Sequence, residues 1–374
     1  MSKHLNITGC FLFLSFFFQT ILSAQNTSIG TKDIVSGEVW KDTDGNVINA
    51  HGGILFNNGK YYWFGEHRPS SGFTTQVGVT CYSSTDLRNW KYEGVALAVS
   101  DEVGSDIEKG CIIERPKVIY NQKTGKYVMW FHLELKGRGY GPSRAGVAVS
   151  DTPAGPYRFI RSGRVNPGVY PLNMTREEQK LTWNPEDYEW WTPEWREAVN
   201  KGMFVKRDLE GDGQMSRDMT LFVDDDGTAY HIYSSEENLT LHIAELSDDY
   251  LSHTGKYIRI FPGGHNEAPA IFKKDGTYWM IASGCTGWEP NEARLMTASS
   301  ILGEWSQLPN PCVGKDAKIT FGGQSTYILP LKDGGYMFMA DVWRPKSLSD
   351  SRYIWLPVRF NGKGIPFIEW VDKW

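Results

Sequence analysis

The sequence predicts an all-β protein: a five-bladed β-propeller whose blades are four-stranded antiparallel sheets. The first observation is a motif that occurs five times, in which a polar residue opens a short apolar run, a tight turn follows, and an aromatic run comes next. Two apolar runs joined by a glycine-containing turn are the strongest short-range signal of a β-hairpin. Five copies of a hairpin-led unit indicate a radial array of sheets.

The first two strands of each blade come from this motif. The polar residues that open the five copies, called head residues below, are His51, Glu114, Asp218, Glu267 and Gln324. The turns that follow are Asn58-Gly59, Thr124-Gly125, Asp226-Gly227, Asp275-Gly276 and Gly334-Gly335. Because the blades surround one central channel, we expect the five head residues to meet at one end of that channel.

Further apolar runs supply the remaining strands, which is the second observation. Third strands are predicted at residues 76–82, 144–150, 239–244, 293–298 and 353–358. After three of these runs comes a turn followed by an aromatic residue, namely Trp90, Tyr157 or Trp305. This pattern predicts a fourth strand with one inward-facing ring.

An aromatic-rich insertion at about 165–213 lengthens the third repeat. It contains Trp183, Tyr188, Trp190, Trp191 and Trp195. Thr192-Pro193 is a helix start, so a short helix is predicted over 194–199. Long segments between strands are usually functional or disordered, and the aromatics favour order. The sequence leaves open whether the insertion covers the site or packs at a blade edge.

The first 24 residues are typical of a signal peptide. The apolar run at 11–18 precedes Leu22-Ser23-Ala24, a small-residue cleavage site before Gln25. The run is too short for a membrane span. We therefore expect a secreted or periplasmic protein whose residues 25–374 form a single propeller domain. Export permits disulfides, but the four mature cysteines allow three pairings and the sequence selects none.

Charge and motifs narrow the range of partners. The net charge of −5 gives no basic footprint for nucleic acid. No dinucleotide or phosphate loop is present, so no organic cofactor is expected. The acidic turn at 224–227 lacks the spacing of a calcium loop, and no metal site is predicted. Aromatic residues make up 14% of the chain, and such rings both fill blade interfaces and stack on sugars. The oligomeric state is left open.

Three of the head residues are carboxylic acids, Glu114, Asp218 and Glu267. Hydrolysis of a glycosidic bond needs one acid that donates a proton and a second group that activates water. Glu267 opens an otherwise apolar strand, so burial and neighbouring anions should raise its pKa. We expect the adjacent cations Arg217 and Arg115 to keep Asp218 and Glu114 ionised. The sequence therefore predicts an oligosaccharide- or polysaccharide-cleaving site.

The segments at 114–118, 216–222 and 267–271 resemble glycoside hydrolase family 43, in its exo-β-1,3-galactanase-like branch or a neighbouring one. The resemblance covers about residues 45–370. It implies an inverting, exo-acting enzyme in which Glu267 is the general acid. It also implies that Asp218 orients this acid and modulates its pKa, and that Glu114 binds the terminal sugar.

The first head residue differs from most of the family, in which an Asp that acts as general base stands where this chain has His51. The galactanase-like branch shares this departure, and Gln324 matches a glutamine proposed there to act on water. Glu114 is the chemical alternative, because a carboxylate accepts a proton more readily than an amide does. The enzyme hypothesis predicts a separation of roughly 6.5–9.5 Å between Glu267 and Gln324, which leaves room for a water molecule as in inverting enzymes.

Further matches to the family predict the substrate-binding residues, which with His51 are Glu66, Tyr140, Thr286 and Trp288. The favoured function is a secreted exo-β-1,3-galactosidase that acts on arabinogalactan. Two alternatives stay open at this point: an α-L-arabinofuranosidase of the same family, and a carbohydrate-binding propeller without catalysis.

Overall fold

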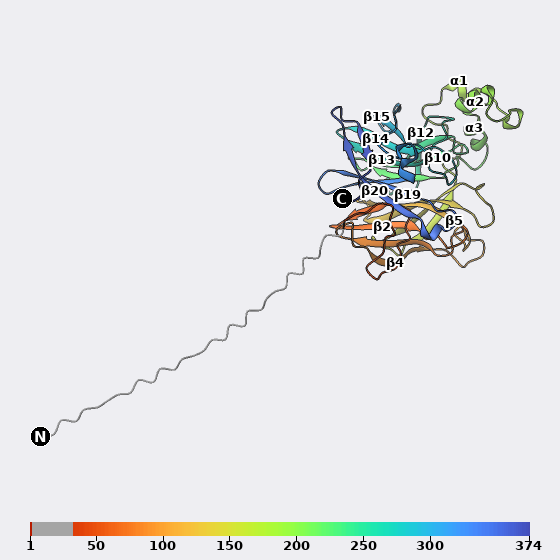
Figure 1. The fold of residues 1–374 in the computed structure, drawn as a ribbon. Helices are drawn as coiled ribbons and strands as arrows, with labels where there is room; N and C mark the ends of the chain where they lie inside the picture. The colour runs from red at the N-terminus through yellow and green to blue at the C-terminus, as the bar shows by residue number, and fades with distance from the viewer. Residues whose placement is uncertain (2–32) are drawn as a thin grey trace. The chain divides into compact units, whose positions relative to one another are not determined.

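The computed structural model describes Met1 and residues 33–374, and residues 33–374 form one compact unit (Figure 1). The predicted signal peptide at 1–24 lies, apart from Met1, outside the described residues. Within the described part of the chain, no helix is both long enough and apolar enough to cross a membrane.

Five antiparallel sheets make up this unit, as predicted. The first blade contains β1 (Ile54–Asn57), β2 (Lys60–Glu66), β3 (Gly78–Ser84) and β4 (Lys91–Ala98). The second contains β5 (Ile112–Asn121), β6 (Lys126–Glu134), β7 (Arg144–Ser150) and β8 (Arg158–Gly163). The third contains β9 (Met219–Val223), β10 (Ala229–Ser235), β11 (Thr240–Leu246) and β12 (His253–Ile260).

The last two blades continue the same order. The fourth contains β13 (Glu267–Lys274), β14 (Thr277–Ser283), β15 (Arg294–Ala298) and β16 (Ser306–Leu308). The fifth contains β18 (Gln324–Pro330), β19 (Tyr336–Val342), β20 (Arg352–Phe360) and β21 (Pro366–Glu369). A short strand that the sequence did not predict, β17 (Cys312–Val313), pairs in parallel with β21. Short 3-10 turns, η2 (Ala317–Gly322) and η3 (Leu348–Asp350), join strands in this part of the chain.

Buried side chains fill the gaps between neighbouring blades. Each of five apolar clusters draws its residues from two adjacent sheets, so every blade packs on the next and the fifth packs on the first. At the junction of the first and fifth blades, the rings of Trp63 and Trp355 lie 4.8 Å apart. Backbone hydrogen bonds between Ile34 and Trp374 join the two ends of the unit. The predicted five-bladed propeller is therefore confirmed.

Two of the innermost strands, β5 and β13, carry a β-bulge next to the head residue. The register of β5 shifts between Glu114 and Lys117, and that of β13 shifts between Glu267 and Ala270. The residues after the two heads, Arg115 and Ala268, have left-handed φ angles of 55° and 52°. Because a bulge re-aims the side chains of a strand, both heads and Arg115 are directed to the channel mouth.

The insertion forms a small helical layer on the third blade, near β10 and β12 (Figure 1). It contains α1 (Arg176–Lys180), the 3-10 turn η1 (Pro185–Asp187), α2 (Pro193–Asn200) and α3 (Met203–Leu209). The helix predicted over 194–199 is thus present as α2. Thr192 caps it by accepting a hydrogen bond from the Trp195 amide.

The insertion has its own core and a fixed attachment. Trp195, Val199 and Phe204 are buried against Leu239, which lies in the turn between β10 and β11. Arg259 of β12 donates to the carbonyl oxygens of Val199 and Asn200 at the end of α2. These contacts answer the question that the sequence left open, because the insertion packs at the edge of the third blade.

The cysteines of the described chain are all free thiols, at Cys81, Cys111, Cys285 and Cys312. Burial raises the pKa of Cys111 and of Cys312 to about 12. These two side chains therefore act as small apolar core residues.

Candidate active site

A pocket of about 270 Å³ opens where the innermost strands begin. The head residues that line it are Glu114, Asp218, Glu267 and Gln324. Its aromatic lining comprises Phe73, Tyr140, Trp288 and Trp343. The volume lies just below the range of drug-sized ligand sites, which suits a ligand of about one sugar unit. No residue of the helical insertion lines this pocket.

Glu267 is the head residue best suited to hold a proton. Its Oε1 atom accepts a hydrogen bond of 2.7 Å from Asn238 Nδ2. Burial and, next in size, the negative charge of Asp218 raise the pKa of Glu267 to about 7, although Arg115 partly opposes this shift. Near neutral pH the side chain is therefore partly protonated, as a general acid must be.

Arg115 connects the other polar groups of the pocket. Its Nη2 atom donates to Asp218 Oδ2 at 3.0 Å, and its Nη1 atom donates to Asp341 Oδ2 at 3.1 Å. The same guanidinium also donates to Gln324 Oε1. Arg115 thus holds the second, third and fifth blades together at the channel mouth.

The expected pairing of each acid with its neighbour in sequence was wrong. Asp218 pairs with Arg115, whereas Arg217 donates to Ser143 Oγ and to the Tyr140 carbonyl. Arg217 and Asp218 are adjacent residues of an extended segment and point to opposite faces. Glu114 and Arg115 both reach the pocket because of the bulge that follows Glu114, but the Arg115 guanidinium extends to Asp218 of the third blade.

Glu114 sits among positive charges. Arg68 Nη2 and the Tyr140 hydroxyl donate to its Oε1 atom at 3.0 and 3.1 Å, and His132 Nδ1 lies 3.1 Å from Oε2. Burial alone would raise the pKa of Glu114, but Arg68 and His132 outweigh it and hold the pKa well below its usual range. Glu114 is therefore an anion and a weak proton acceptor.

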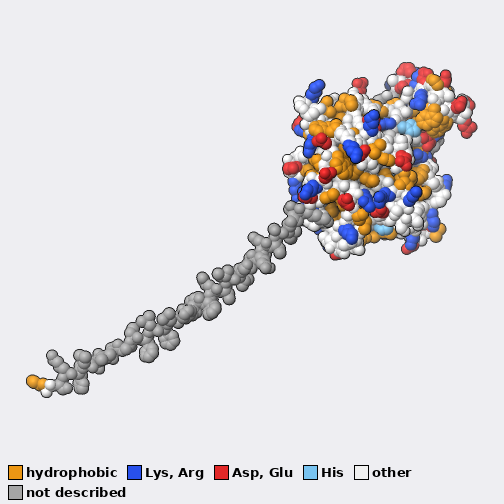
Figure 2. Space-filling view, in the orientation of Figure 1, with side chains coloured by type: hydrophobic (Ala, Val, Ile, Leu, Met, Phe, Trp, Pro, Cys, Tyr) orange, Lys and Arg blue, Asp and Glu red, His pale blue; other side chains and the backbone are white. Residues whose placement is uncertain are grey.

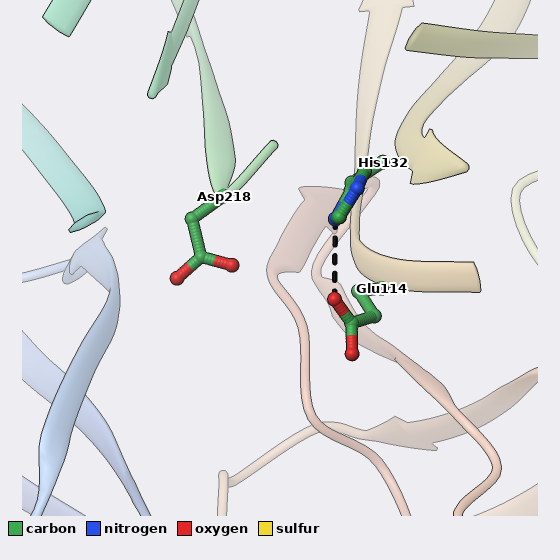
Figure 3. Close-up of side chains that lie close together, drawn as sticks. All are labelled: Glu114, His132 and Asp218. Atoms are coloured by element: carbon green, nitrogen blue, oxygen red, sulfur yellow. Dashed lines mark ion pairs between the residues drawn. The ribbon is translucent and has the colours of Figure 1, made fainter. Parts of the chain in front are cut away.

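Glu114, His132 and Asp218 lie close enough together to suggest a metal site (Figure 3). Although burial favours neutral imidazole, hydrogen bonds to Glu114 and Glu134 raise the pKa of His132 to about 9. A protonated histidine cannot bind a metal. Arg68 and Arg115 already neutralise the two carboxylates, so this trio does not fit a cation.

Gln324 is held by four groups. Its Oε1 atom accepts from Arg115 and, at 2.9 Å, from Trp343 Nε1. Its Nε2 atom donates to Ser283 Oγ at 3.0 Å and lies 3.4 Å from Glu267 Oε2. The expected separation of 6.5–9.5 Å was wrong for this arrangement. Two donors fix the amide oxygen on one side, which turns the amide nitrogen toward Glu267.

Two residues expected to bind substrate lie beneath the pocket. His51 Nδ1 pairs with Asp341 at 2.9 Å, and burial, which outweighs this contact, lowers the pKa of His51. Glu66 pairs with Arg68 at 3.1 Å, and burial raises its pKa to about 8. Both side chains are 1% exposed, and neither lines the pocket. Their position lets them support Arg68 and Arg115 from below.

The other three predicted substrate-binding residues divide between two places. Tyr140 and Trp288 line the pocket. Thr286 does not, because it lies in an exposed turn where it donates to the Glu289 carbonyl and accepts from Asn291. Its contacts stabilise the turn that carries Trp288.

The sequence did not single out several pocket residues: Arg68, Phe73, His132, Asn238 and Trp343. Three of them share a place in the fold, at or just after the end of the second strand of a blade. Second strands run antiparallel to the innermost ones, so their last residues return to the channel mouth. Arg68, His132 and Trp343 could have been predicted from the sequence as pocket residues, because each is a polar or aromatic residue at or near the end of a second strand.

Known proteins resemble the chain over nearly all of its described length. A solved β-1,3-galactosidase of glycoside hydrolase family 43, in complex with galactodeoxynojirimycin, is 80% identical, with a TM-score of 0.90 over 91% of this chain and 99% of that one. An exo-β-1,3-galactanase from Phanerochaete chrysosporium, solved with galactose, is 34% identical, with a TM-score of 0.71 over 91% of this chain and 68% of the other.

Shorter matches agree with these. The family model for glycosyl hydrolases family 43 matches residues 192–344. A curated β-D-galactofuranosidase of Aspergillus niger is 31% identical over 121 residues, 32% of this chain and 35% of that protein. A raffinose invertase of Escherichia coli is 28% identical over 145 residues, 38% of this chain and 29% of that protein. The match thus spans about a third of the length of these curated relatives.

The propeller, the half-protonated acid and these likenesses together define a glycoside hydrolase. The identity of 80% over 99% of a solved family member identifies the family as well. The chain belongs to glycoside hydrolase family 43.

Proposed function

We propose that the protein is an inverting exo-β-1,3-galactosidase that removes terminal galactose from the β-1,3-linked backbone of arabinogalactan. The observation that carries this proposal is Glu267, whose pKa of about 7 makes it a proton donor in a pocket of about 270 Å³. The β-1,3-galactosidase and exo-galactanase names of the similar solved structures support the choice of sugar and linkage.

The proposed reaction is a single displacement at the anomeric carbon. Glu267 donates its proton to the glycosidic oxygen while a water molecule attacks the anomeric carbon from the opposite face of the sugar. The water loses a proton, which passes by way of the activating group to solvent, and Glu267 regains a proton from solvent before the next turnover. Asp218 raises the pKa of this acid through its charge. Glu114, held by Arg68 and Tyr140, accepts hydrogen bonds from hydroxyl groups of the terminal sugar.

Gln324 is the residue that we assign to the attacking water. Arg115 and Trp343 anchor its amide oxygen at the pocket wall, and movement of its amide nitrogen away from Glu267 on sugar binding would open space for the water. Glu114 is the alternative. Its low pKa makes it a weak proton acceptor for a carboxylate, and its contacts with Arg68, Tyr140 and His132 commit it to binding the sugar.

Azide rescue distinguishes Gln324 from Glu114 as the group that activates water. Azide is a nucleophile that needs no activation, so it restores turnover only in the variant that has lost the activating group. We expect rescue of Gln324→Gly and none of Glu114→Gly.

The activity test compares two substrates and follows one product. We expect release of galactose from β-1,3-galactobiose and no release of nitrophenol from 4-nitrophenyl α-L-arabinofuranoside. Proton NMR of the first turnovers should show α-galactose, because inversion of a β-linkage gives the α-anomer. Cleavage of the arabinofuranoside instead would favour the arabinofuranosidase alternative, and β-galactose as the first product would exclude inversion.

We also propose that the enzyme works outside the cytoplasm, since arabinogalactan is a large extracellular polymer. The pattern of residues 1–24 supports this proposal. Amino-terminal sequencing of the protein from its native host should begin at Gln25. A cytoplasmic protein that retains Met1 would refute export without affecting the proposed activity.

A further inference from the structure

The helical insertion exposes two neighbouring tryptophans, Trp190 and Trp191, of which 46% and 49% is open to solvent. Tryptophan is usually largely buried, and exposed apolar groups rimmed by polar residues mark binding surfaces. In the space-filling view, hydrophobic side chains gather on the part of the molecule that carries the insertion, with acidic side chains along its edge (Figure 2). Nothing in the catalytic mechanism uses this surface.

The two indole rings are held in place by the layer beneath them. Trp190 lies 5.0 Å from the buried Trp195 and 5.8 Å from the buried Phe204, measured between ring centroids. Trp191 also lies 5.0 Å from Trp195, and the guanidinium of Arg196 sits 5.5 Å from its ring. Rings that are fixed before a ligand arrives lose little conformational entropy on binding.

The backbone of Trp191 is strained. Its φ angle is 76°, in the left-handed region that glycine tolerates and a bulky side chain does not. Such strain costs on the order of 1–3 kcal/mol and is found mainly where function maintains it. A glycine would fit the turn before α2 better, so the indole ring itself is the feature that the chain retains.

The tryptophans stand on the acid side of the pocket. The Trp191 ring lies 4.9 Å from the ring of His265. His265 is two residues before Glu267 in the sequence, so the Cα atoms of His265 and Glu267 are at most about 7 Å apart. The backbone amides of His265 and Asn266 donate to the carbonyl oxygens of Leu239 and Asn238. Leu239 belongs to the insertion core, whereas the Asn238 side chain bonds Glu267. One short segment thus links the insertion to the general acid.

We infer that Trp190 and Trp191 form a platform that binds the galactan chain beyond the bond being cleaved. The inference rests on the proposed function, in which the leaving group departs on the side of Glu267 and carries the rest of the polymer with it. The ring of a β-linked galactose has an apolar C–H face that stacks on an indole ring. The insertion also carries exposed carboxylates, among them Glu189 and Glu194, and these favour a neutral polysaccharide over an anionic one.

The test is the dependence of kcat/KM on chain length. In the Trp190→Ala/Trp191→Ala double variant, we expect kcat/KM for long β-1,3-galactan to fall about tenfold, the equivalent of one good stacking contact. The value for β-1,3-galactobiose should change much less, because no residue of the insertion lines the pocket and a disaccharide extends beyond that pocket by one sugar only. Trp370→Ala is the matched control, since Trp370 is 36% exposed and lies near the end of the chain outside the insertion; it should leave both values unchanged.

Trp191→Gly separates binding from folding. Glycine relieves the strained φ angle, so this variant should melt at or above the temperature of the wild type while its polymer activity falls. Binding is measured separately by affinity electrophoresis in β-1,3-galactan, with Glu267→Gln as the parent. The added tryptophan changes should raise the galactan concentration needed for half-maximal retardation about tenfold.

Three outcomes would overturn the inference or its premise. Equal loss on disaccharide and polymer would show that the tryptophans only support the pocket. Unchanged kinetics with an altered size-exclusion profile would identify the surface as a contact between protein chains. A wild-type protein that cleaves neither galactobiose nor galactan would refute the proposed function itself, which is distinct from failure of the platform.

Discussion

The second and fourth blades present the same residue type at the same place and give it opposite properties. Glu114 and Glu267 both head an innermost strand, and each precedes a residue with a left-handed φ angle. Glu114 meets Arg68 and His132, which lower its pKa, whereas burial and the charge of Asp218 raise the pKa of Glu267 to about 7. The position in the fold brings the acids together, but the charged groups around each acid decide which of them holds a proton.

The largest expected effect comes from removing the proton donor, Glu267, which lies in the fourth blade. Glu267→Gln should lower kcat on galactobiose by about 10³-fold, since general acid catalysis contributes about 10²–10⁴-fold. The loss should be much smaller for an aryl β-galactoside, provided that the pocket accepts it, because a good leaving group needs no proton. Steady-state kinetics on both substrates measure the difference.

The control for this variant is Glu177→Gln, a change of the same type on an exposed residue of α1. It should leave kcat unchanged. An equal loss of activity on galactobiose and on the aryl galactoside would contradict the role of Glu267 as proton donor. Glu267 would then, like Glu114, only bind the sugar.

A second prediction concerns the negative charge of Asp218, which helps to make the pKa of Glu267 higher than that of Glu114. Protonated Glu267 is the active form, so kcat should fall as pH rises through about 7. Asp218→Asn removes the anion that raises this pKa and leaves Arg115 to lower it further. The alkaline limb of the kcat profile should therefore move down by about one pH unit, and kcat at pH 7 should fall about fivefold, because the protonated fraction of Glu267 falls from about one half to about one tenth.

The pH profile distinguishes this role from a structural one. A variant that is merely misfolded loses activity at every pH, with the limb in its original place. A limb that stays near pH 7 in Asp218→Asn would show that the charge of Asp218 does not set the pKa of Glu267.

The sequence was sufficient for the parts of this site that depend on periodicity. Repeated heads on repeated strands placed Glu114, Asp218, Glu267 and Gln324 around one pocket, because blade symmetry converts a position within a repeat into a position in space. His51 obeys the same symmetry but is buried below the pocket, where it supports Asp341. The repeat in the sequence predicts which residues lie at the mouth of the channel. It does not predict whether a side chain there lines the pocket or is buried beneath it.

The pairings between charged groups could not be predicted in this way. Arg115 reaches Asp218 across 103 residues, and Arg68 reaches Glu114 across 46. Each pairing depends on a bulge or a strand end that re-aims one side chain, and neither leaves a periodic trace. For the same reason the short distance between Gln324 and Glu267 was not expected, since it follows from the way in which Arg115 and Trp343 hold the amide.

The smallest expected effect is on stability, and there the two acids should differ in sign. Glu267 has a raised pKa, so its ionisation opposes folding and the wild type loses stability as pH rises from about 4.5 to about 7. Glu267→Gln escapes this loss. At pH 8 it should melt higher than the wild type by about 2–4 °C, the shift expected for 1 kcal/mol in a medium-sized domain, and at pH 4.5 the two should melt together.

Glu114→Gln should behave in the opposite way. The depressed pKa of Glu114 stabilises the fold above the pKa of the unfolded state and stops doing so as the pH falls. The variant also leaves Arg68 with less compensation, and breaking one partner of a buried pair costs about 3–5 kcal/mol. It should therefore melt lower than the wild type at pH 8, with a deficit that begins to narrow only as the pH falls below about 4.5. Melting curves of the two variants that shifted in the same direction at pH 8 would show that the two blades do not hold their acids in opposite states.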